Sequence, residues 1–535
     1  MTTRPQDDTA NRRAGLLIPL FSCHTTASWG IGDIADIAPI TRWLAGAGLR
    51  ALQLLPINEI APNQQSPYSA ISAMAIDPMF IHVPAVPEFD ALGGEAALPS
   101  DDRRLLDAAR AAPRIDYASI RRLKRSSLRR AFERFLDREW RAETARGREL
   151  LTFTSEQAWW LEDYSLFRAI HAREQERPWT EWPAALQRRE PAAIDQARRE
   201  LSDDVLYHQY LQWIAASQWR RARQDARQNE PSVALFGDLP FMVDGDSADV
   251  WARQHQFDLD MAVGAPPDAF SATGQDWGMP LYNWEVLAAE DFRWLRERAR
   301  RSADLYDGYR IDHLVGFYRT YGRSRSTGEA RFTPANEPSQ LALGEHLLDV
   351  FRSAGAEIIA EDLGTVPDFV RESLARSSVP GFRVLRWERC WHTEGQPFRD
   401  PTQYPRVSVA SSGTHDTEPQ IEWWEHASAD EREKVIRLPT IDRTSHGVDL
   451  RQAPYNPFVR DALLEALFAS NSDLLLVPVQ DAFGWRDRVN EPATIADHNW
   501  TYKLPWPVDK LDDVAEARER RDQLRAWSER YNRHG

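Results

Sequence analysis

The fold is decided by YDGYRID (306–312) and AEIIAEDLG (356–364), two short apolar stretches that each end in or just before acidic side chains. A helix-length segment separates them, and this alternation is typical of parallel β-strands joined by α-helices. In a parallel barrel the active site is built where the strands reach their carboxyl ends. The two stretches therefore predict an α/β protein with acidic groups at that end.

Six further runs of the same kind occur along the chain. Eight strands favour a closed (β/α)8 barrel, the TIM barrel, over an open doubly wound sheet, because the count is right and acidic residues recur at carboxyl-terminal strand ends. The additional runs are LLIPL (16–20), LRALQLLP (49–56), VALFGDLPF (233–241), FRVLRWE (382–388), VSVASSGTHD (407–416) and DLLLVPVQD (473–481).

We expect one barrel interrupted by a large inserted helical subdomain. Residues 1–99 start the barrel with its first strands and a substrate-binding loop, and residues 231–535 hold the remainder. Between them, residues 100–230 contain segments such as SLRRAFERFLDREW (127–140), which have amphipathic helical periodicity. A coiled coil is the alternative, but no heptad is sustained long enough to support it.

Two later segments complete the domain prediction. Residues 258–284 are rich in Gly, Pro and aromatic side chains and are interpreted as a long loop, which in compact domains is usually functional. Residues 509–531 are predicted to form one helix that closes the barrel. No β-rich C-terminal domain is expected after it.

Composition and charge exclude several classes of function. The 535 residues carry a formal charge of −15, which argues against a general nucleic-acid binder because phosphate backbones select a basic surface. Cys23 and Cys390 are the only cysteines, so no disulfide framework is suggested and a reducing cytoplasm fits. The first dozen residues lack the apolar core of a signal peptide, and no run is long enough to span a membrane. We expect a cytoplasmic protein without nucleic-acid or membrane partners.

Arg310 and Asp312 are two residues apart on a predicted strand, so both point to the same face. A guanidinium beside a carboxylate favours the ionised form, which a nucleophilic or metal-binding Asp needs. A structural ion pair at a strand end is the alternative, and for an isolated R-x-D it would be preferred. His313, at the start of the next loop, favours the functional interpretation by its position.

Glu361 and Asp362 follow the second of the two deciding strands. Alternation sends one side chain inward and the other sideways. A Glu at a barrel mouth with apolar walls would have a raised pKa, as an acid catalyst requires. The alternative is that both are solvated acids that cap the next helix, and it competes more strongly for Asp362.

His415 and Asp416 end another predicted strand, in SSGTHDT (411–417). Ser412 next to them suggests a hydrolase triad, but triads are assembled across space and have no such local signature. An imidazole and a carboxylate that face a shared pocket are the better interpretation.

Three carboxylates on three strands of one barrel suit retaining glycosidic transfer, which uses a carboxylate nucleophile and a carboxylic acid. The rival is a Mg²⁺ or Ca²⁺ site. DGDSAD (244–249) lacks the Gly spacing and terminal Glu of an EF-hand, so calcium is not expected there. GIGDIA (30–35) is only a truncated dinucleotide fingerprint, so no nucleotide cofactor is expected.

Taken together, the motifs resemble one family, the 4-α-glucanotransferases of the amylomaltase or disproportionating type, glycoside hydrolase family 77. The resemblance runs from Trp29 to Trp500, and the motifs occur in the family's order. They are WGIGDI (29–34), SPYSAISA (66–73), GDLPFMVDGDSADVW (237–251), GAPPDAFSATGQDWGMPLYNW (264–284), YRIDH (309–313), IIAEDLG (358–364), SGTHDT (412–417) and HNW (498–500).

The resemblance implies a role for each matching residue. Asp312 would be the nucleophile, Glu361 the acid/base and Asp416 the transition-state stabiliser. Five residues would bind or line the donor sugar subsite and two would cover the acceptor side. The donor-side residues are Tyr68, Asp238, Arg310, His313 and His415, and the acceptor-side residues are Gln275 and Trp277.

The implied activity is transfer of α-1,4-linked glucan segments from a donor to the 4-hydroxyl of an acceptor glucan or glucose, with no metal or organic cofactor. An α-glucan hydrolase of the same clan and a non-catalytic glucan-binding protein are the alternatives. We expect a monomer or homodimer. The sequence departs from the family pattern at Met279, at Thr417 and in HLVGFYRTY (313–321), all outside the acidic trio, which bears on acceptor and chain-length preference.

Overall fold

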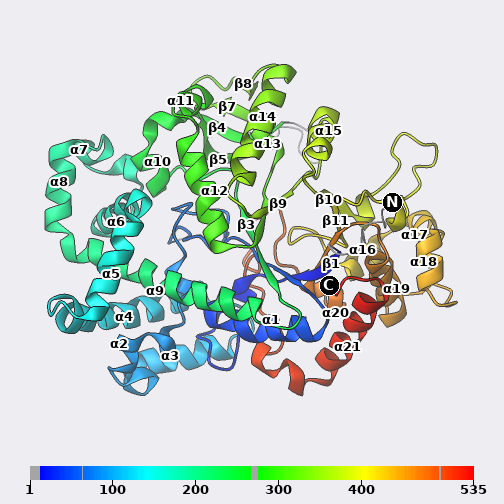
Figure 1. The fold of residues 1–535 in the computed structure, drawn as a ribbon, viewed down its shortest axis with the longest axis horizontal. Helices are drawn as coiled ribbons and strands as arrows, with labels where there is room; N and C mark the ends of the chain where they lie inside the picture. The colour runs from blue at the N-terminus through cyan, green and yellow to red at the C-terminus, as the bar shows by residue number, and fades with distance from the viewer. Residues whose placement is uncertain are drawn as a thin grey trace, which may run out of the picture.

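Eight short parallel strands close into a barrel at the centre of the protein (Figure 1). The structure is a computed structural model that describes residues 12–62, 64–266, 275–451, 453–492, 494 and 496–534. The strands follow one another around the barrel in chain order, so the predicted (β/α)8 barrel is confirmed. They are β1 (Arg13–Leu17), β2 (Ala51–Gln53), β3 (Ala234–Leu239), β6 (Gly308–Ile311), β9 (Glu357–Ala360), β10 (Gly381–Val384), β11 (Ser408–Ser411) and β12 (Leu474–Pro478).

The strands are apolar on both faces because each face is buried. In β12, Leu474 and Leu476 join a small apolar cluster to which six barrel strands contribute, whereas Leu475 and Val477 belong to the main apolar core. This alternation follows from the period of two in a β-strand. Strands buried on both faces have near-continuous apolar sequences, which explains why the eight runs could be recognised.

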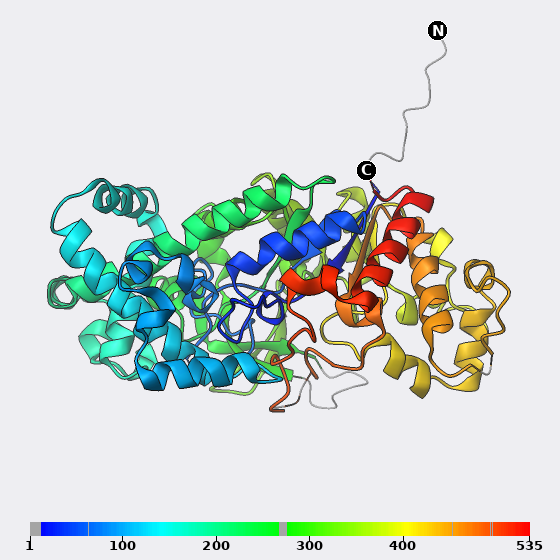
Figure 2. The same ribbon diagram turned by 90° about the horizontal axis from the view of Figure 1, so that it is seen from below.

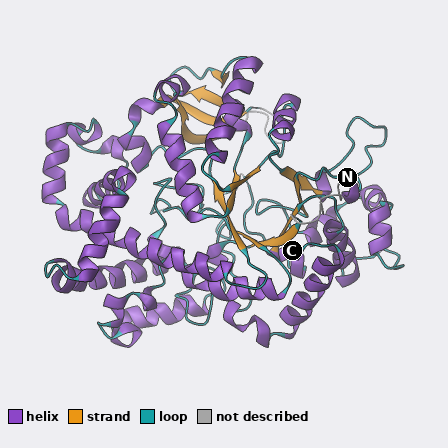
Figure 3. Cartoon of the chain, viewed as in Figure 1, coloured by secondary structure: helices purple, strands orange, loops and turns teal. Residues whose placement is uncertain are grey.

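Helices surround the barrel (Figure 3). Helix α14 begins after Asn336, whose side chain accepts the Ser339 N–H, and α19 begins at Pro457 after the capping Asn456. Both arrangements satisfy or remove N–H groups that the first helical turn leaves unpaired. The larger of these helices are α1 (Ile37–Gly46), α12 (Arg293–Leu305), α14 (Glu337–Arg352), α15 (Asp368–Arg376), α19 (Pro457–Phe468) and α21 (Ala515–Arg530). The shorter ones are α10 (Ala248–Ala252), α11 (Trp284–Ala289), α13 (Val315–Tyr318), α16 (Gln420–His426), α17 (Ala429–Ile436), α18 (Pro439–Thr444) and α20 (Val479–Phe483).

The long connection between β2 and β3 carries a group of helices that lies to one side of the barrel (Figure 2). The last of them returns to the barrel, where the indole N–H of Trp219 donates to the Leu305 carbonyl at 2.7 Å. The predicted division at residues 99/100 and 230/231 stays a prediction. The helices are α2 (Pro87–Asp90), α3 (Ser100–Ala111), α4 (Tyr117–Phe135), α5 (Ala145–Glu156), α6 (Ala158–Arg173), α7 (Ala184–Gln187), α8 (Pro191–Glu200) and α9 (Ser202–Arg227).

A second sheet was not predicted. The described part of 258–284, expected to be a loop, forms the antiparallel strands β4 (Phe257–Ala265) and β5 (Gln275–Tyr282), and residues 267–274 lie outside the described residues. Two more strands, β7 (Thr320–Ser324) and β8 (Ala330–Thr333), complete the order β5-β4-β7-β8. Two of the Gly and Pro residues that suggested a loop are compatible with strands. A Cβ on Gly264 would lie 1.8 Å from the Gln275 carbonyl, and Pro280 occupies the edge strand, where a missing N–H is tolerated.

The C-terminal helix is also shorter than predicted. Residues 509–531 are divided at Val514, whose backbone is extended with φ −92° and ψ 121°, so a 3₁₀ helix (Val508–Asp513) precedes α21. The Val514 side chain packs against the main apolar core, which accounts for the interruption. None of the described helices is long and apolar enough to cross a membrane.

Candidate active site

Asp312 and Glu361 lie next to each other at the carboxyl ends of neighbouring strands. Ile311 of β6 and Ala360 of β9 are register partners, and the two acids are the residues that follow them. The ladder continues through both positions, since the Asp312 N–H donates to the Leu239 carbonyl at 3.0 Å and the Glu361 N–H to the Ile311 carbonyl at 3.1 Å. The barrel therefore fixes the backbone of both acids.

Arg310 holds two carboxylates at once. Its Nη1 lies 2.7 Å from Oδ2 and 2.9 Å from Oδ1 of Asp238, its register partner on β3, and its Nη2 lies 2.8 Å from Oδ1 of Asp312. The guanidinium is 5% exposed, so these interactions are little screened by solvent. The ion pair expected from R-x-D is present, and Asp238 extends it to a third strand end.

Glu361 is held by the turn that follows Asp312. Its Oε2 accepts the backbone N–H of His313 at 2.9 Å and its Oε1 accepts that of Leu363 at 3.1 Å. His313 has a left-handed backbone, with φ 48°, which is uncommon outside glycine. Burial raises the pKa of Glu361 to about 7, and the negative charge of Asp312 adds to this although Arg310 opposes it. The carboxyl group can therefore both donate and accept a proton near neutral pH.

Tyr68 connects opposite sides of the barrel mouth. Its hydroxyl donates to Oδ2 of Asp238 at 2.8 Å and lies 3.0 Å from Nε2 of His415, on the loop after β11. The rings of Tyr68 and His415 are stacked, with centroids 5.4 Å apart, and Trp500 lies against both. His415 Nε2 is also 3.3 Å from Oδ2 of Asp416.

Asp416 has a second partner, Asn490, whose Nδ2 donates to Oδ1 at 2.7 Å. Burial would raise the pKa of Asp416, but His415 and the Asn490 hydrogen bond outweigh burial and lower the pKa. The same contact with Asp416 raises the pKa of His415 against the effect of its own burial. An ionised Asp416 is thus the stable form over the physiological range.

Gln275 and Trp277 join this group from β5. The Trp277 indole meets the His313 ring edge to face, with centroids 4.8 Å apart and an interplanar angle of 89°. Its Nε1 donates to Oε1 of Gln275 at 3.0 Å. The structure therefore brings all ten predicted site residues into one continuous set of contacts, which extends from Gln275 through the acids to Asp416.

Comparisons with known proteins bear on this arrangement. The sequence profile of a family described as 4-alpha-glucanotransferase, glycoside hydrolase family 77, matches residues 18–509. The chain belongs to this family.

Relatives and solved structures agree with the family match over nearly the whole chain. A 4-alpha-glucanotransferase from Synechocystis sp. is 34% identical over 519 residues, which are 94% of this chain and 95% of the relative. One from Thermus thermophilus is 32% identical over 532 residues, 95% of this chain and 99% of the relative. An amylomaltase from Streptococcus agalactiae, solved in complex with acarbose, has a TM-score of 0.81 at 26% identity and covers 98% of this chain and 99% of its own.

Asp362 has a different place in this 4-alpha-glucanotransferase from the one expected. It is 4% exposed and accepts the Phe382 N–H at 2.7 Å, with Arg383 at 3.2 Å. The interpretation of Glu361 and Asp362 as solvated caps of the next helix is wrong, because α15 begins only at Asp368. Asp362 instead ties β9 to β10, the neighbouring strand.

Two residues to which the sequence assigned no role also contact this set, Asn490 beside Asp416 and Trp500 beside Tyr68. Both lie in the irregular chain after β12, where no strand end marks a position as inward-facing. Thr417, a departure from the family pattern, closes its own turn by hydrogen bonds with the Thr414 N–H and carbonyl, both at 3.0 Å. Met279 lies partly buried on β5, two residues after Trp277.

The acidic motifs set aside in the sequence have structural partners. In DGDSAD, Asp246 accepts the Trp179 N–H at 2.9 Å and lies 3.3 Å from His171. In GIGDIA, Asp33 caps the short helix that follows by accepting the Ala35 N–H. Within the described ranges, no group of three or more His, Cys, Asp or Glu side chains is arranged to hold a metal ion.

Proposed function

We propose that the protein transfers α-1,4-linked glucan segments to the 4-hydroxyl of an acceptor glucan or glucose by a retaining double displacement. Asp312 is the nucleophile, Glu361 the acid/base and Asp416 the transition-state stabiliser. One observation supports this assignment above the others. A carboxyl group with a pKa of about 7, Glu361, lies one strand away from Asp312, which is held by Arg310 at 2.8 Å. A carboxylic acid beside a carboxylate nucleophile is what the chemistry requires.

In the first step the Asp312 carboxylate attacks the anomeric carbon of the donor. The bond from that carbon to the glycosidic oxygen breaks, and Glu361 gives its proton to the departing oxygen. Arg310 holds the attacking carboxylate in place through the 2.8 Å contact with Oδ1 of Asp312. Positive charge that develops on the sugar ring lies near the carboxylate of Asp416, whose pKa is lowered by its neighbours.

In the second step the acceptor replaces the leaving glucan. Its 4-hydroxyl gives a proton to the Glu361 carboxylate and attacks the anomeric carbon, and Asp312 is released. Two inversions give net retention. Because the pKa of Glu361 lies near 7, neither of its two protonation states is strongly disfavoured at neutral pH.

The substrate-binding residues divide between two sides of the site. On the donor side, Tyr68, Asp238 and His415 form a hydrogen-bonded set suited to sugar hydroxyl groups. On the acceptor side, Trp277 offers a partly exposed indole next to His313, and such flat apolar faces suit sugar rings. The Streptococcus agalactiae amylomaltase was solved in complex with acarbose, and we infer that this site takes ligands of the same class.

Incubation with maltotriose tests the proposal, with products resolved by chain length. Transfer yields glucose together with a series of longer maltooligosaccharides. Glucose and maltose alone, without any longer product, would assign the site to a hydrolase instead. The Asp312→Asn variant is the control, because it should form neither set of products.

Location and assembly are inferred from the sequence. Cys23 and Cys390 both carry free thiols in the structure, which supports the expected reducing cytoplasm. The expected monomer or homodimer stays a prediction, and the sedimentation velocity of the purified chain tests it.

A further inference from the structure

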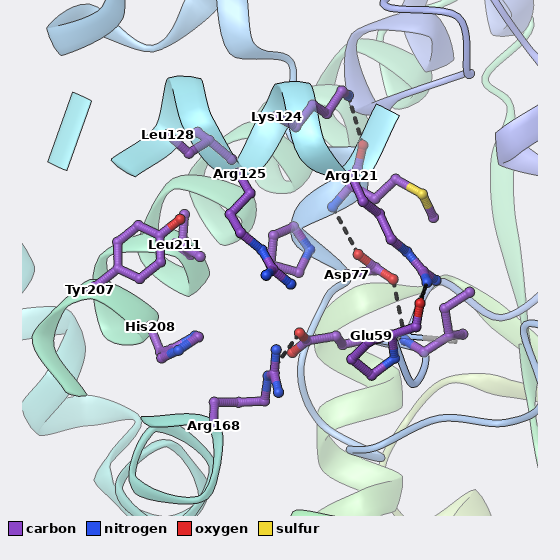
Figure 4. Close-up of a pocket in the computed structure, with 14 residues that line it drawn as sticks. Glu59, Asp77, Arg121, Lys124, Arg125, Leu128, Arg168, Tyr207, His208 and Leu211 are labelled. Atoms are coloured by element: carbon purple, nitrogen blue, oxygen red, sulfur yellow. Dashed lines mark hydrogen bonds and ion pairs between the residues drawn. The ribbon is translucent and has the colours of Figure 1, made fainter. Parts of the chain in front are cut away.

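A second cavity lies in the helical group, between α4, α6 and α9 (Figure 4). Its inner part has a volume of about 90 Å³ and continues into an outer cleft of about 640 Å³. Arg121, Arg125, Arg168, Tyr207 and His208 line both parts. None of the ten proposed site residues lines either part, so this cavity is separate from the barrel mouth.

The cavity is strongly cationic, although the protein carries a formal charge of −15. Six basic side chains line its two parts, against three carboxylates. The basic residues are Arg121, Arg122, Lys124, Arg125, Arg129 and Arg168.

The three carboxylates are occupied by other partners. Glu59 accepts from Nε of Arg168 at 3.0 Å, and Glu176 accepts from Nη1 of Arg168 at 3.1 Å. Asp77 accepts two backbone N–H groups, at 2.8 and 3.2 Å. Arg168 is thus neutralised from both sides, and Asp77 faces the positive charge of Arg121.

Three arginines lie along one face of α4. Arg121, Arg125 and Arg129 are spaced four residues apart, so their side chains are neighbours on the helix surface. Arg129 is paired with Asp204 at 2.8 Å, and Arg121 donates to two backbone carbonyls. Arg125 has only a long ion pair, between its Nη2 and Oε1 of Glu176 at 3.9 Å. Figure 4 shows the Arg125 side chain reaching from α4 into the cavity.

His208 supplies a second, independent observation. The imidazole lines the cavity and is 7% exposed, and its Nδ1 is buried without a hydrogen-bond partner among the described residues. A buried polar atom without a partner destabilises the protein, so a hydrogen-bond partner for this ring would be stabilising. Burial lowers the pKa of His208, and the charges of Arg168 and Arg129 lower it further. An anion in the cavity would offset both arginine effects.

We propose that this cavity binds a phosphorylated small molecule. The guanidinium of Arg125 presents a planar pair of donors that matches phosphate oxygens, and His208 offers a ring N–H. Arg121, on the same face of α4, adds positive charge around the same position. The carbon part of the ligand lies against the apolar wall formed by Tyr207, Leu128 and Leu211.

Isothermal titration of the full chain at low ionic strength tests the site with glucose 6-phosphate, inorganic phosphate and maltotriose. We expect saturable binding of glucose 6-phosphate, weaker binding of inorganic phosphate, and no change in either when excess maltotriose fills the barrel site of the Asp312→Asn variant, which should bind it without transfer. Arg125→Glu and His208→Phe should each weaken glucose 6-phosphate binding roughly tenfold or more. Arg138→Glu, which changes an exposed arginine in the same helical group, should not.

Several results would overturn the proposal. Absence of saturable binding of both phosphates would show that the cavity holds no such site. Equal losses of binding in Arg125→Glu and Arg138→Glu would show that only general electrostatic attraction is involved. Equal affinity for the two phosphates would show that the carbon part of the ligand contributes nothing to binding. Melting temperatures check folding. If His208→Phe is unstable, Arg125→Met provides the second variant, because the Arg125 side chain is 63% exposed.

Discussion

The backbone N–H of His313 donates a 2.9 Å hydrogen bond to Oε2 of Glu361. His313 is also the residue after Asp312, so one turn positions both carboxyl groups. Its backbone is left-handed, with φ 48°, so the chain turns away from the strand direction directly after this hydrogen bond. Any change that relaxes this turn therefore alters the two groups together.

Replacement of Glu361 by Gln should reduce transfer by roughly a hundredfold or more, and the residual rate should lack the basic limb of the pH profile. The pKa of Glu361 lies at about 7, so the wild-type rate of the first step should fall about tenfold per pH unit above that value as the proton is lost. Initial rates with maltotriose between pH 5 and 9 measure both effects. Glu372→Gln, an exposed change on α15, is the matched control and should keep the wild-type profile.

The same pKa predicts how stability depends on pH. Glu361 titrates near 4.5 when unfolded and at about 7 when folded, so between these values the native state binds more protons and stability falls as pH rises. Gln cannot ionise, so Glu361→Gln should raise the melting temperature more at pH 8 than at pH 5. The substitution also removes one of the two hydrogen bonds that Glu361 accepts from backbone N–H groups. This loss lowers the melting temperature equally at both pH values, so it does not affect the difference between them. An equal change at both pH values would contradict a raised pKa.

Asp312→Asn should reduce transfer by roughly a thousandfold or more while maltotriose still binds. The amide keeps the shape of the side chain and one oxygen for Arg310, but it lacks the charge needed to attack the anomeric carbon. Product analysis and titration with maltotriose separate the two properties. Full activity in this variant would assign the nucleophile to another residue.

Asn490 is predicted to act through Asp416. Asn490→Ala removes the 2.7 Å hydrogen bond, and because the Asp416 side chain is 42% exposed we expect a decrease in kcat of only roughly tenfold. The pKa of Asp416 should rise, which moves the acid limb of the pH profile to higher pH. Asn490→Asp adds a like charge and should move it further.

A matched control separates this effect from the general cost of losing an amide. Asn471→Ala also removes one side-chain hydrogen bond, from Nδ2 to the Tyr404 carbonyl at 3.0 Å, but on the opposite side of β12 in the chain. Its pH profile should be unchanged. If Asn471→Ala and Asn490→Ala have the same profile, Asn490 has only a structural role.

The barrel could be predicted from the sequence because its strands are buried on both faces. A run such as Leu474–Pro478 has no polar face and so stands out from amphipathic helices. Asp312 and Glu361 were found for a related reason, since each is the first polar group after such a run. Asp238 was assigned through the family resemblance, and its register pairing with Arg310 appears only in the structure.

The sheet of β4, β5, β7 and β8 could not be predicted in the same way. In β4, Leu259 is exposed and Met261 buried, and the register shifts between Asp258 and Ala262, so no strict alternation is present. Asn490 and Trp500 lie in irregular chain and are brought to the site by tertiary packing alone. Local sequence patterns carry no record of such contacts.

Gly237 should be intolerant of even one added carbon, and this prediction tests how tightly the strand end that carries Asp238 is packed. A Cβ at this position would lie 2.3 Å from Cε2 of Tyr306, a buried and rigid ring. Gly237→Ala should therefore destabilise the protein by about 1–3 kcal/mol. A shift of β3 would also move Asp238 relative to Arg310, so we expect kcat to fall together with the melting temperature.

Gly46→Ala is the control, since its nearest neighbour is the flexible Cδ of Arg521 at 3.2 Å and the residue ends α1. Ala favours helix over Gly by about 1 kcal/mol, so this variant should be neutral or more stable. Tyr306→Leu combined with Gly237→Ala should recover part of the lost stability, because the aromatic ring is the obstacle. If the double variant is no more stable than Gly237→Ala, the loss comes from the backbone of β3 and not from the contact with Tyr306.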